Sequence, residues 1–158
     1  MSALKIKHLF LVLSIAVLTS LAWVPVHAQD MSCTDHIPVV IDIKPGSITN
    51  PINLSANGLL PVAVLTTPDF DASQFMPEMA HLNDANTPMD QGCTGAAAQR
   101  WVFSDVNKDG KIDLVFYFQI QDLNLTATST AAMLMAHGSY GGATIHIMGS
   151  DIVSVVPN

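Results

Sequence analysis

Apolar and polar residues alternate over several short stretches in the first half of this chain. Residues 39–44 begin to alternate at Ile41 and stop at the turn pair Pro45-Gly46. Residues 59–65 form a continuous apolar run, separated from residues 52–54 by Asn57-Gly58, a pair that favours a tight turn with positive φ. We expect these stretches to be strands, and the continuous run to be buried.

The second half of the chain also contains short stretches typical of strands. Residues 101–103 and 114–118 are rich in aromatic and β-branched side chains and flank a polar loop, so they are predicted to be strands. Residues 123–136 are compatible with a strand or a helix by composition, but Thr126, Thr128 and Thr130 alternate with small or apolar residues, which favours a strand. Residues 138–142 predict a hairpin turn, and the remaining strands are expected at residues 143–148 and 151–156.

Residues 67–100 show no clear period and contain Pro68, Pro77 and Pro88. We interpret them as a long connection that either contains an unrecognised element or forms a functional surface. About eight short strands with almost no amphipathic helical stretch predict an all-β fold. The expected architecture is a single β-sandwich, Ig-like or jelly-roll-like, or a small barrel, with one calcium loop between strands.

The amino terminus has the order of a secretory signal peptide. Lys5 and Lys7 precede an apolar run at residues 9–24, and Ala28 supplies a small residue for cleavage. An uncleaved anchor is the alternative, but the run is short and interrupted. We expect residues 1–28 to be removed and 29–158 to form one domain with its core in 39–157, secreted to an extracellular or periplasmic location without a membrane span.

Charge and cysteine content fit such a location. Two of the six Lys and Arg residues lie in the leader and none of the thirteen Asp and Glu do, so the mature chain carries four basic and thirteen acidic residues, a formal charge of −9. Nucleic acid is therefore not an expected partner. Cys33 and Cys93 are predicted to form a disulfide in an oxidising compartment, with two free thiols as the alternative.

One loop carries a specific chemical pattern, which predicts a Ca²⁺ site. Calcium takes six to eight oxygen ligands, and a tight loop can present them from alternate positions if a glycine at position six allows the turn. Gly110 is that glycine. The candidate ligands stand at positions one, three, five, seven (through its backbone carbonyl) and nine: Asp105, Asn107, Asp109, Lys111 and Asp113.

The loop is EF-hand-like but departs from an EF-hand. Its twelfth position is Phe116 instead of a bidentate Glu, and its flanks are predicted strands rather than helices. Calcium would need another acid, such as Asp122, Asp69 or Asp71, and a dissociation constant on the order of 10⁻⁴ to 10⁻³ M is expected. The alternative is a solvated turn rich in Asp and Asn, in which the close acids would repel one another.

The chain resembles a family of secreted bacterial and archaeal β-domains without an established activity. The resemblance covers roughly residues 39–157 and lies in residues 41–46, 53–54 with 58–65, 105–114 and 121–123. It implies a β-rich extracellular module. Lys108 stands where the family usually has Gly. The loop is also similar to those of dockerins, thrombospondin type 3 repeats and integrin-type propellers, but these use several copies.

No catalytic constellation is evident in the sequence. The four histidines outside the leader are not closely spaced, Gly138 to Gly142 lacks a nucleophile-elbow spacing, and methionines in strands are explained by packing. We therefore expect a non-catalytic, calcium-binding interaction module with an unknown protein or glycan partner. The alternative is a weak hydrolase or carbohydrate-binding protein that uses loop acids such as Asp69 and Asp71, or Asp42.

Overall fold

The computed structural model describes residues 36–88 and 94–156, which belong to one compact unit. These residues form mainly strands: β1 (Ile37–Pro38), β2 (Ile41–Ile43), β3 (Pro51–Ile52), β4 (Leu59–Val64), β5 (Phe75–Asp84), β6 (Ala96–Ser104), β7 (Asp113–Gln119), β8 (Ala131–Tyr140), β9 (Ala143–Ile152) and β10 (Ser154–Val155). Two short 3₁₀ helices, η1 (Ala72–Gln74) and η3 (Ile120–Asp122), lie between strands.

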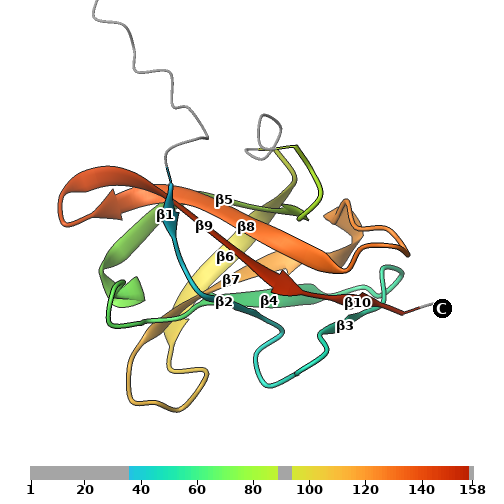
Figure 1. The fold of residues 1–158 in the computed structure, drawn as a ribbon, viewed down its shortest axis with the longest axis horizontal. Helices are drawn as coiled ribbons and strands as arrows, with labels where there is room; N and C mark the ends of the chain where they lie inside the picture. Colours follow the sequence, from blue (N-terminus) through green and yellow to red (C-terminus); the bar gives the residue numbers. More distant parts are fainter. Residues whose placement is uncertain (1–35, 89–93, 157–158) are drawn as a thin grey trace, which may run out of the picture. The chain divides into compact units, whose positions relative to one another are not determined.

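Eight of the strands form one curled sheet in the order β1-β9-β8-β5-β6-β7-β4-β2, and β10 pairs with β3 in a separate parallel ribbon. Figure 1 shows this sheet wrapping around itself into a half-barrel. The all-β prediction is thus confirmed. A single curled sheet corresponds more closely to the small barrel than to the two-sheet sandwich.

The two edge strands of the sheet are consecutive in the chain. β1 pairs in parallel with β9, and two residues later β2 pairs with β4 at the other edge. The Val39 N–H donates to the carbonyl of Met148 (2.8 Å), whereas the carbonyl of Val40 accepts from the N–H of Leu65 (2.9 Å). Residues 39 and 40 therefore connect the two edges of the sheet.

The concave face of the sheet holds the core because its strands alternate. Leu114, Phe116 and Phe118 of β7 are buried, as are Leu134 of β8 and Val62 of β4. At the end of β8 the chain turns on Gly141 and Gly142, whose φ values of 58° and 84° match the two-residue turn that suits the twist of paired strands. The hairpin turn predicted there is confirmed.

The interpretation of residues 67–100 as a long connection was wrong. This segment contains η1, the ten-residue β5 and the first part of β6. The pattern of β5 escaped notice because a bulge between Pro77 and Met79 breaks its period and because β5 is central in the sheet, paired with β8 and β6. The alternative of an unrecognised element is the correct one.

Two further expectations were also wrong. Residues 123–136 are not one strand: Thr126 to Ser129 form a turn in which the Ser129 N–H donates to the Thr126 carbonyl (3.0 Å), and β8 begins only at Ala131. Gly58 does not have positive φ, and β3 and β4 do not pair with each other. Threonine alternation reflected local hydroxyl hydrogen bonds here instead of a strand.

The predicted signal peptide and the predicted Cys33–Cys93 disulfide lie outside the described residues.

No helix in residues 36–88 and 94–156 is long and apolar enough to cross a membrane.

Candidate metal centre

The predicted calcium loop joins two neighbouring strands of the curled sheet. β6 and β7 are antiparallel, and their last register pair is Ser104 with Asp113, so residues 105–112 close a hairpin. Figure 1 shows this loop extending beyond the ends of the two strands. The strand-loop-strand order expected from the sequence is confirmed.

Side-chain oxygens inside the loop converge on its backbone. The Asp109 N–H donates to Asp105 Oδ1 (3.2 Å) and to Asn107 Oδ1 (3.0 Å). The Gly110 N–H donates to Asp105 Oδ2 (3.0 Å), and the Lys111 N–H donates to Asp109 Oδ1 (2.8 Å). Oxygens from positions one, three and five thus face one small region of the loop.

Such a pattern is chemically suited to a cation. Each backbone N–H donates to one lone pair of a side-chain oxygen and so fixes the orientation of that side chain. A carboxylate has further lone pairs that remain free to bind a cation. Three oxygen-bearing side chains held at this spacing match the hard, oxygen-rich coordination that Ca²⁺ prefers. The side chain of Asn107 also donates through Nδ2 to Asp109 Oδ2 (3.2 Å), so the neutral amide separates two acids.

Two residues of the loop have left-handed backbone conformations. Gly110 has φ 85° and Lys108 has φ 63°. Glycine adopts this region without strain, but a side chain with a Cβ does so at a cost. Lys108 therefore stands at a position where glycine is physically preferred.

Asp113 lies at the base of the loop rather than at its tip. Its carboxylate is fully buried and accepts from the N–H of Val106 (3.0 Å) and from the N–H of Thr66 (2.9 Å). Thr66 also donates its hydroxyl to the Ile112 carbonyl (2.6 Å). Asp113 therefore ties the loop to the end of β4, a structural role that its spacing in the sequence did not reveal.

Thr66 is the residue of this region that sequence reasoning missed. Besides its contacts with the loop, its hydroxyl accepts from the N–H of Ala72 (2.9 Å), the first residue of η1. A lone threonine after a strand has no distinctive pattern, so only the tertiary structure identifies it.

The structure distinguishes among the acids considered as an additional ligand. Asp122 follows the far end of β7, about 20 Å of extended chain from the loop, so it does not complete the site. Asp69 and Asp71 belong to the segment that Thr66 links to Ile112. The carboxylate of Asp71 caps η1 by accepting from the Ser73 N–H (3.0 Å) and hydroxyl (2.6 Å), whereas Asp69 is exposed.

A separate acidic group surrounds strand β2. Burial, followed by the charges of Asp151 and Asp113, raises the pKa of Asp42 above its ordinary value. Asp151 accepts from the Ile43 N–H (2.9 Å) and the Asn50 side chain (3.0 Å), so it holds β2 against β9. The sequence named Asp42 as a candidate hydrolytic acid, and the structure places it beside these structural carboxylates.

Within the described residues, no three His, Cys, Asp or Glu side chains gather as a metal-binding group. The three acids among the predicted ligands, Asp105, Asp109 and Asp113, therefore do not gather as one group, and Asn107 and the Lys111 carbonyl are donors of other kinds. Comparisons with protein-family models, curated proteins and solved structures found no match to this chain.

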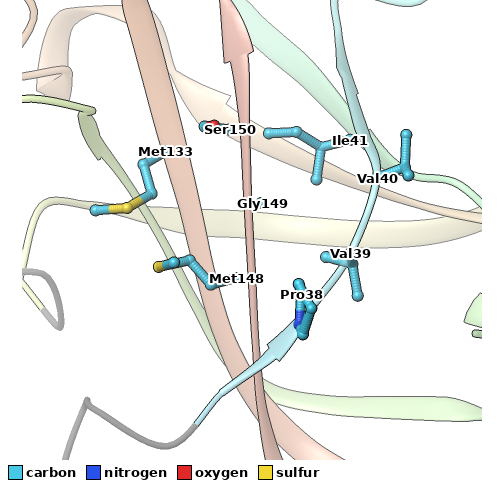
Figure 2. A pocket seen from close by; sticks show the side chains of 8 residues that line it. All are labelled: Pro38, Val39, Val40, Ile41, Met133, Met148, Gly149 and Ser150. Carbon is cyan, nitrogen blue, oxygen red and sulfur yellow. The ribbon is translucent and has the colours of Figure 1, made fainter.

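A pocket of about 360 Å³ lies between the β1–β2 connection and strand β9. Its lining includes Val39, Val40 and Ile41 from that connection together with Met133 and Met148. Figure 2 shows the two methionines on one side of β9 and residues 38–41 on the other. The lining is largely apolar and holds no acid, so the pocket is not the predicted hydrolytic site.

Proposed function

We propose that this protein is an exported, non-catalytic β-domain whose loop at residues 105–113 binds Ca²⁺ and is stabilised by it. The main support is the way side-chain oxygens converge inside the loop. Oxygens of Asp105, Asn107 and Asp109 accept from the backbone N–H groups of three consecutive residues, 109–111. With an acidic chain and modest affinity, the ion acts as a structural staple rather than as a signal.

Strand β6 leads directly into the loop. That strand carries Trp101 and Phe103, whose side chains are 37% and 39% exposed and whose rings pack edge to face at 5.3 Å between centroids. Aromatic side chains dominate contact surfaces for proteins and sugars. This pair supports an interaction role, with a protein or glycan as the partner.

The test is a thermal melt of the purified protein in excess chelator and then across a calcium titration. An ion that binds only the folded state stabilises it by RT ln(1 + [Ca²⁺]/Kd), about 1.4 kcal/mol at ten times the Kd. We expect the midpoint to rise at millimolar calcium. Magnesium should not match this rise because its smaller radius demands a stricter octahedron.

Matched variants assign the effect to the loop. Asp105→Ala and Asp109→Ala should lower the midpoint more in calcium than in chelator, where only the hydrogen bonds to the loop backbone are lost. Asp122→Ala, an exposed acid at the other end of β7, should behave like wild type in both buffers. Equal losses for the loop variants with and without calcium would show that these side chains do not act through an ion.

The alternative is a hydrolase or carbohydrate-processing protein that uses Asp69 and Asp71. It is favoured by the proximity of that segment to the loop through Thr66. An activity that is lost in Asp69→Asn but retained in Asp109→Asn would support it, and a lack of binding to a glycan array would count against the carbohydrate reading.

A further inference from the structure

Methionine and histidine are segregated to one face of the curled sheet. On β5, β8 and β9, side chains of directly paired residues share a face. The core face of these strands carries Ala80, Leu82, Leu134, Ala136 and Ile147. The opposite, convex face of these three strands carries all their methionines and histidines: Met76, Met79, His81, Met133, Met135, His137, His146 and Met148.

At the centre of this face, two adjacent cross-strand pairs form a square. His137 of β8 pairs with His146 of β9, and Met135 pairs with Met148. Paired residues have Cβ atoms about 5 Å apart, and residues two positions apart on a strand are about 7 Å apart. At these Cβ spacings, imidazole and thioether side chains are long enough to reach a common point above the four residues.

The two imidazoles are at a spacing that fits one shared ion. Their ring centroids are 5.6 Å apart with an interplanar angle of 40°. A metal bound to a ring nitrogen lies about 3.2 Å from the ring centroid, so two rings that share an ion subtend an angle of about 120° at this separation. That angle is compatible with trigonal or tetrahedral coordination.

The neighbouring groups point to a ligand as well. His36 precedes Ile37, which is paired in parallel with Ile147, so the register brings His36 beside His146. The Nδ1 atom of His36 is buried and has no hydrogen-bond partner, and a buried polar atom without a partner calls for an explanation. On the other side, Glu78 Oε2 lies 3.7 Å from His137 Nε2 and can orient that ring.

The donor set selects the metal. Within the described chain, His36 does not gather with His137 and His146 as one metal-binding group, so the remaining donors of the proposed site are the thioethers of Met135 and Met148. Thioether sulfur is a soft ligand that favours Cu(I), and imidazole also binds copper, whereas Ca²⁺ and Mg²⁺ require oxygen. Met135 is only 7% exposed, which keeps water from the sulfur, and Met148 also lines the pocket beside β9.

We propose that Met135, His137, His146 and Met148 form a binding site for monovalent copper on the convex face of the sheet. This inference is independent of the calcium loop, because the two sites share no residue and no type of donor. The core cluster on the concave face is built from Leu, Ile, Val, Phe and Ala with no described methionine.

The experiment is a competition for Cu(I), kept reduced by ascorbate, between the purified protein and a coloured Cu(I) chelator. It is done in a Cys33→Ser, Cys93→Ser background to exclude copper bound by thiols. Met135→Leu, Met148→Leu, His137→Gln and His146→Gln preserve side-chain size. We expect each to weaken Cu(I) binding at least tenfold. Met76→Leu, a 52% exposed methionine of the same face outside the square, is the control and should bind as the background protein does.

Two further readouts keep the outcome clear. X-ray absorption of the copper complex in the cysteine-free background should show both nitrogen and sulfur neighbours, and thermal melts of the apo variants should show that they remain folded. Binding that is equal in a variant lacking all four side chains, or a copper spectrum without sulfur, overturns the proposal. Retention of Cu(I) binding in Asp105→Ala separates it from the calcium proposal.

Discussion

Lys108 adopts φ 63° in the calcium loop, a conformation that an L-residue with a Cβ occupies at a cost of about 1–2 kcal/mol. Its side chain is exposed, so no packing repays this strain. The unfavourable backbone persists because the loop is constrained at both ends, by the Ser104–Asp113 pair and by the hydrogen bonds of Asp105. Single residues such as this one show how loop geometry overrides local preference.

Lys108→Gly should therefore stabilise the protein by about 0.5–1 kcal/mol, because relief of strain exceeds the added entropy of the unfolded chain. Urea unfolding monitored by tryptophan fluorescence measures the change. Lys111→Gly is the matched control: it removes the same charge from the same loop, but Lys111 does not have positive φ. A gain of equal size in the control would attribute the effect to charge.

Asp84 supplies a pH-dependent contribution at the end of β5. Burial opposes its charge, but hydrogen bonds from the Ser129 hydroxyl and from the backbone and side chain of Asn86 prevail and lower the pKa of Asp84. A carboxylate whose pKa is depressed by folding contributes stability above its unfolded pKa, and this contribution is lost as pH falls through the folded pKa.

Asp84→Asn is thus expected to lower the thermal midpoint at pH 7, and the difference from wild type should shrink as pH falls below about 4. Melts from pH 2.5 to pH 7 follow this change. Asp122→Asn, which alters an exposed carboxylate, should give a constant and small difference. A penalty for Asp84→Asn that does not vary with pH would rule out the ionised hydrogen-bonded group as its source.

At the scale of elements, the connection between β1 and β2 depends on a glycine in the strand it crosses. A Cβ on Gly149 of β9 would lie 2.6 Å from the Val39 carbonyl oxygen and 2.7 Å from Ile41 Cγ2. The close approach allows residues 39 and 40 to pass from one sheet edge to the other. Close passage of backbones is a recurring reason for glycine within strands.

Gly149→Ala should cost about 1–3 kcal/mol, since the added methyl forces the crossing segment outward. The loss is read from urea unfolding, and amide exchange should report faster opening at Val39 and Leu65. Gly58→Ala is the control, because Gly58 has open space around its would-be Cβ and no positive φ. Similar losses at both positions would contradict a specific role for the crossing.

At the scale of the whole molecule, one core connects strands that are far apart in the sheet order. Leu134 of β8 and Phe116 of β7 are both almost fully buried in the same cluster, although β5 and β6 lie between their strands. A curled sheet folds its own concave face into a common interior. The two halves of the sheet are therefore expected to unfold together.

Leu134→Ala and Phe116→Ala should each cost about 2–5 kcal/mol and leave a single unfolding transition with an unchanged denaturant slope. Ile48→Ala, at a residue that is 90% exposed, should change stability by less than about 0.5 kcal/mol. A variant that splits unfolding into two transitions would show that the halves have separate cores.

The sequence by itself determined features that depend on neighbours along the chain. Alternation predicted β2, a continuous apolar run predicted β4, and aromatic and β-branched residues predicted β7. Glycines predicted the β8–β9 turn, and the spacing of residues 105–113 predicted a loop between two strands. Local patterns suffice for these because strand alternation and turn conformation are properties of short segments.

Only the tertiary structure decided what depends on strand pairing and on residues far apart in the chain. The bulge in β5 breaks the pattern that would have predicted this strand from the sequence. The arrangement of the sheet edges depends on the pairing of β1 with β9 and of β2 with β4, and Asp113 accepts a hydrogen bond from the distant Thr66. His137 and His146 are nine positions apart and face each other only because a hairpin pairs them. Register, which the chain sets by burying one face of each strand, brings such side chains together.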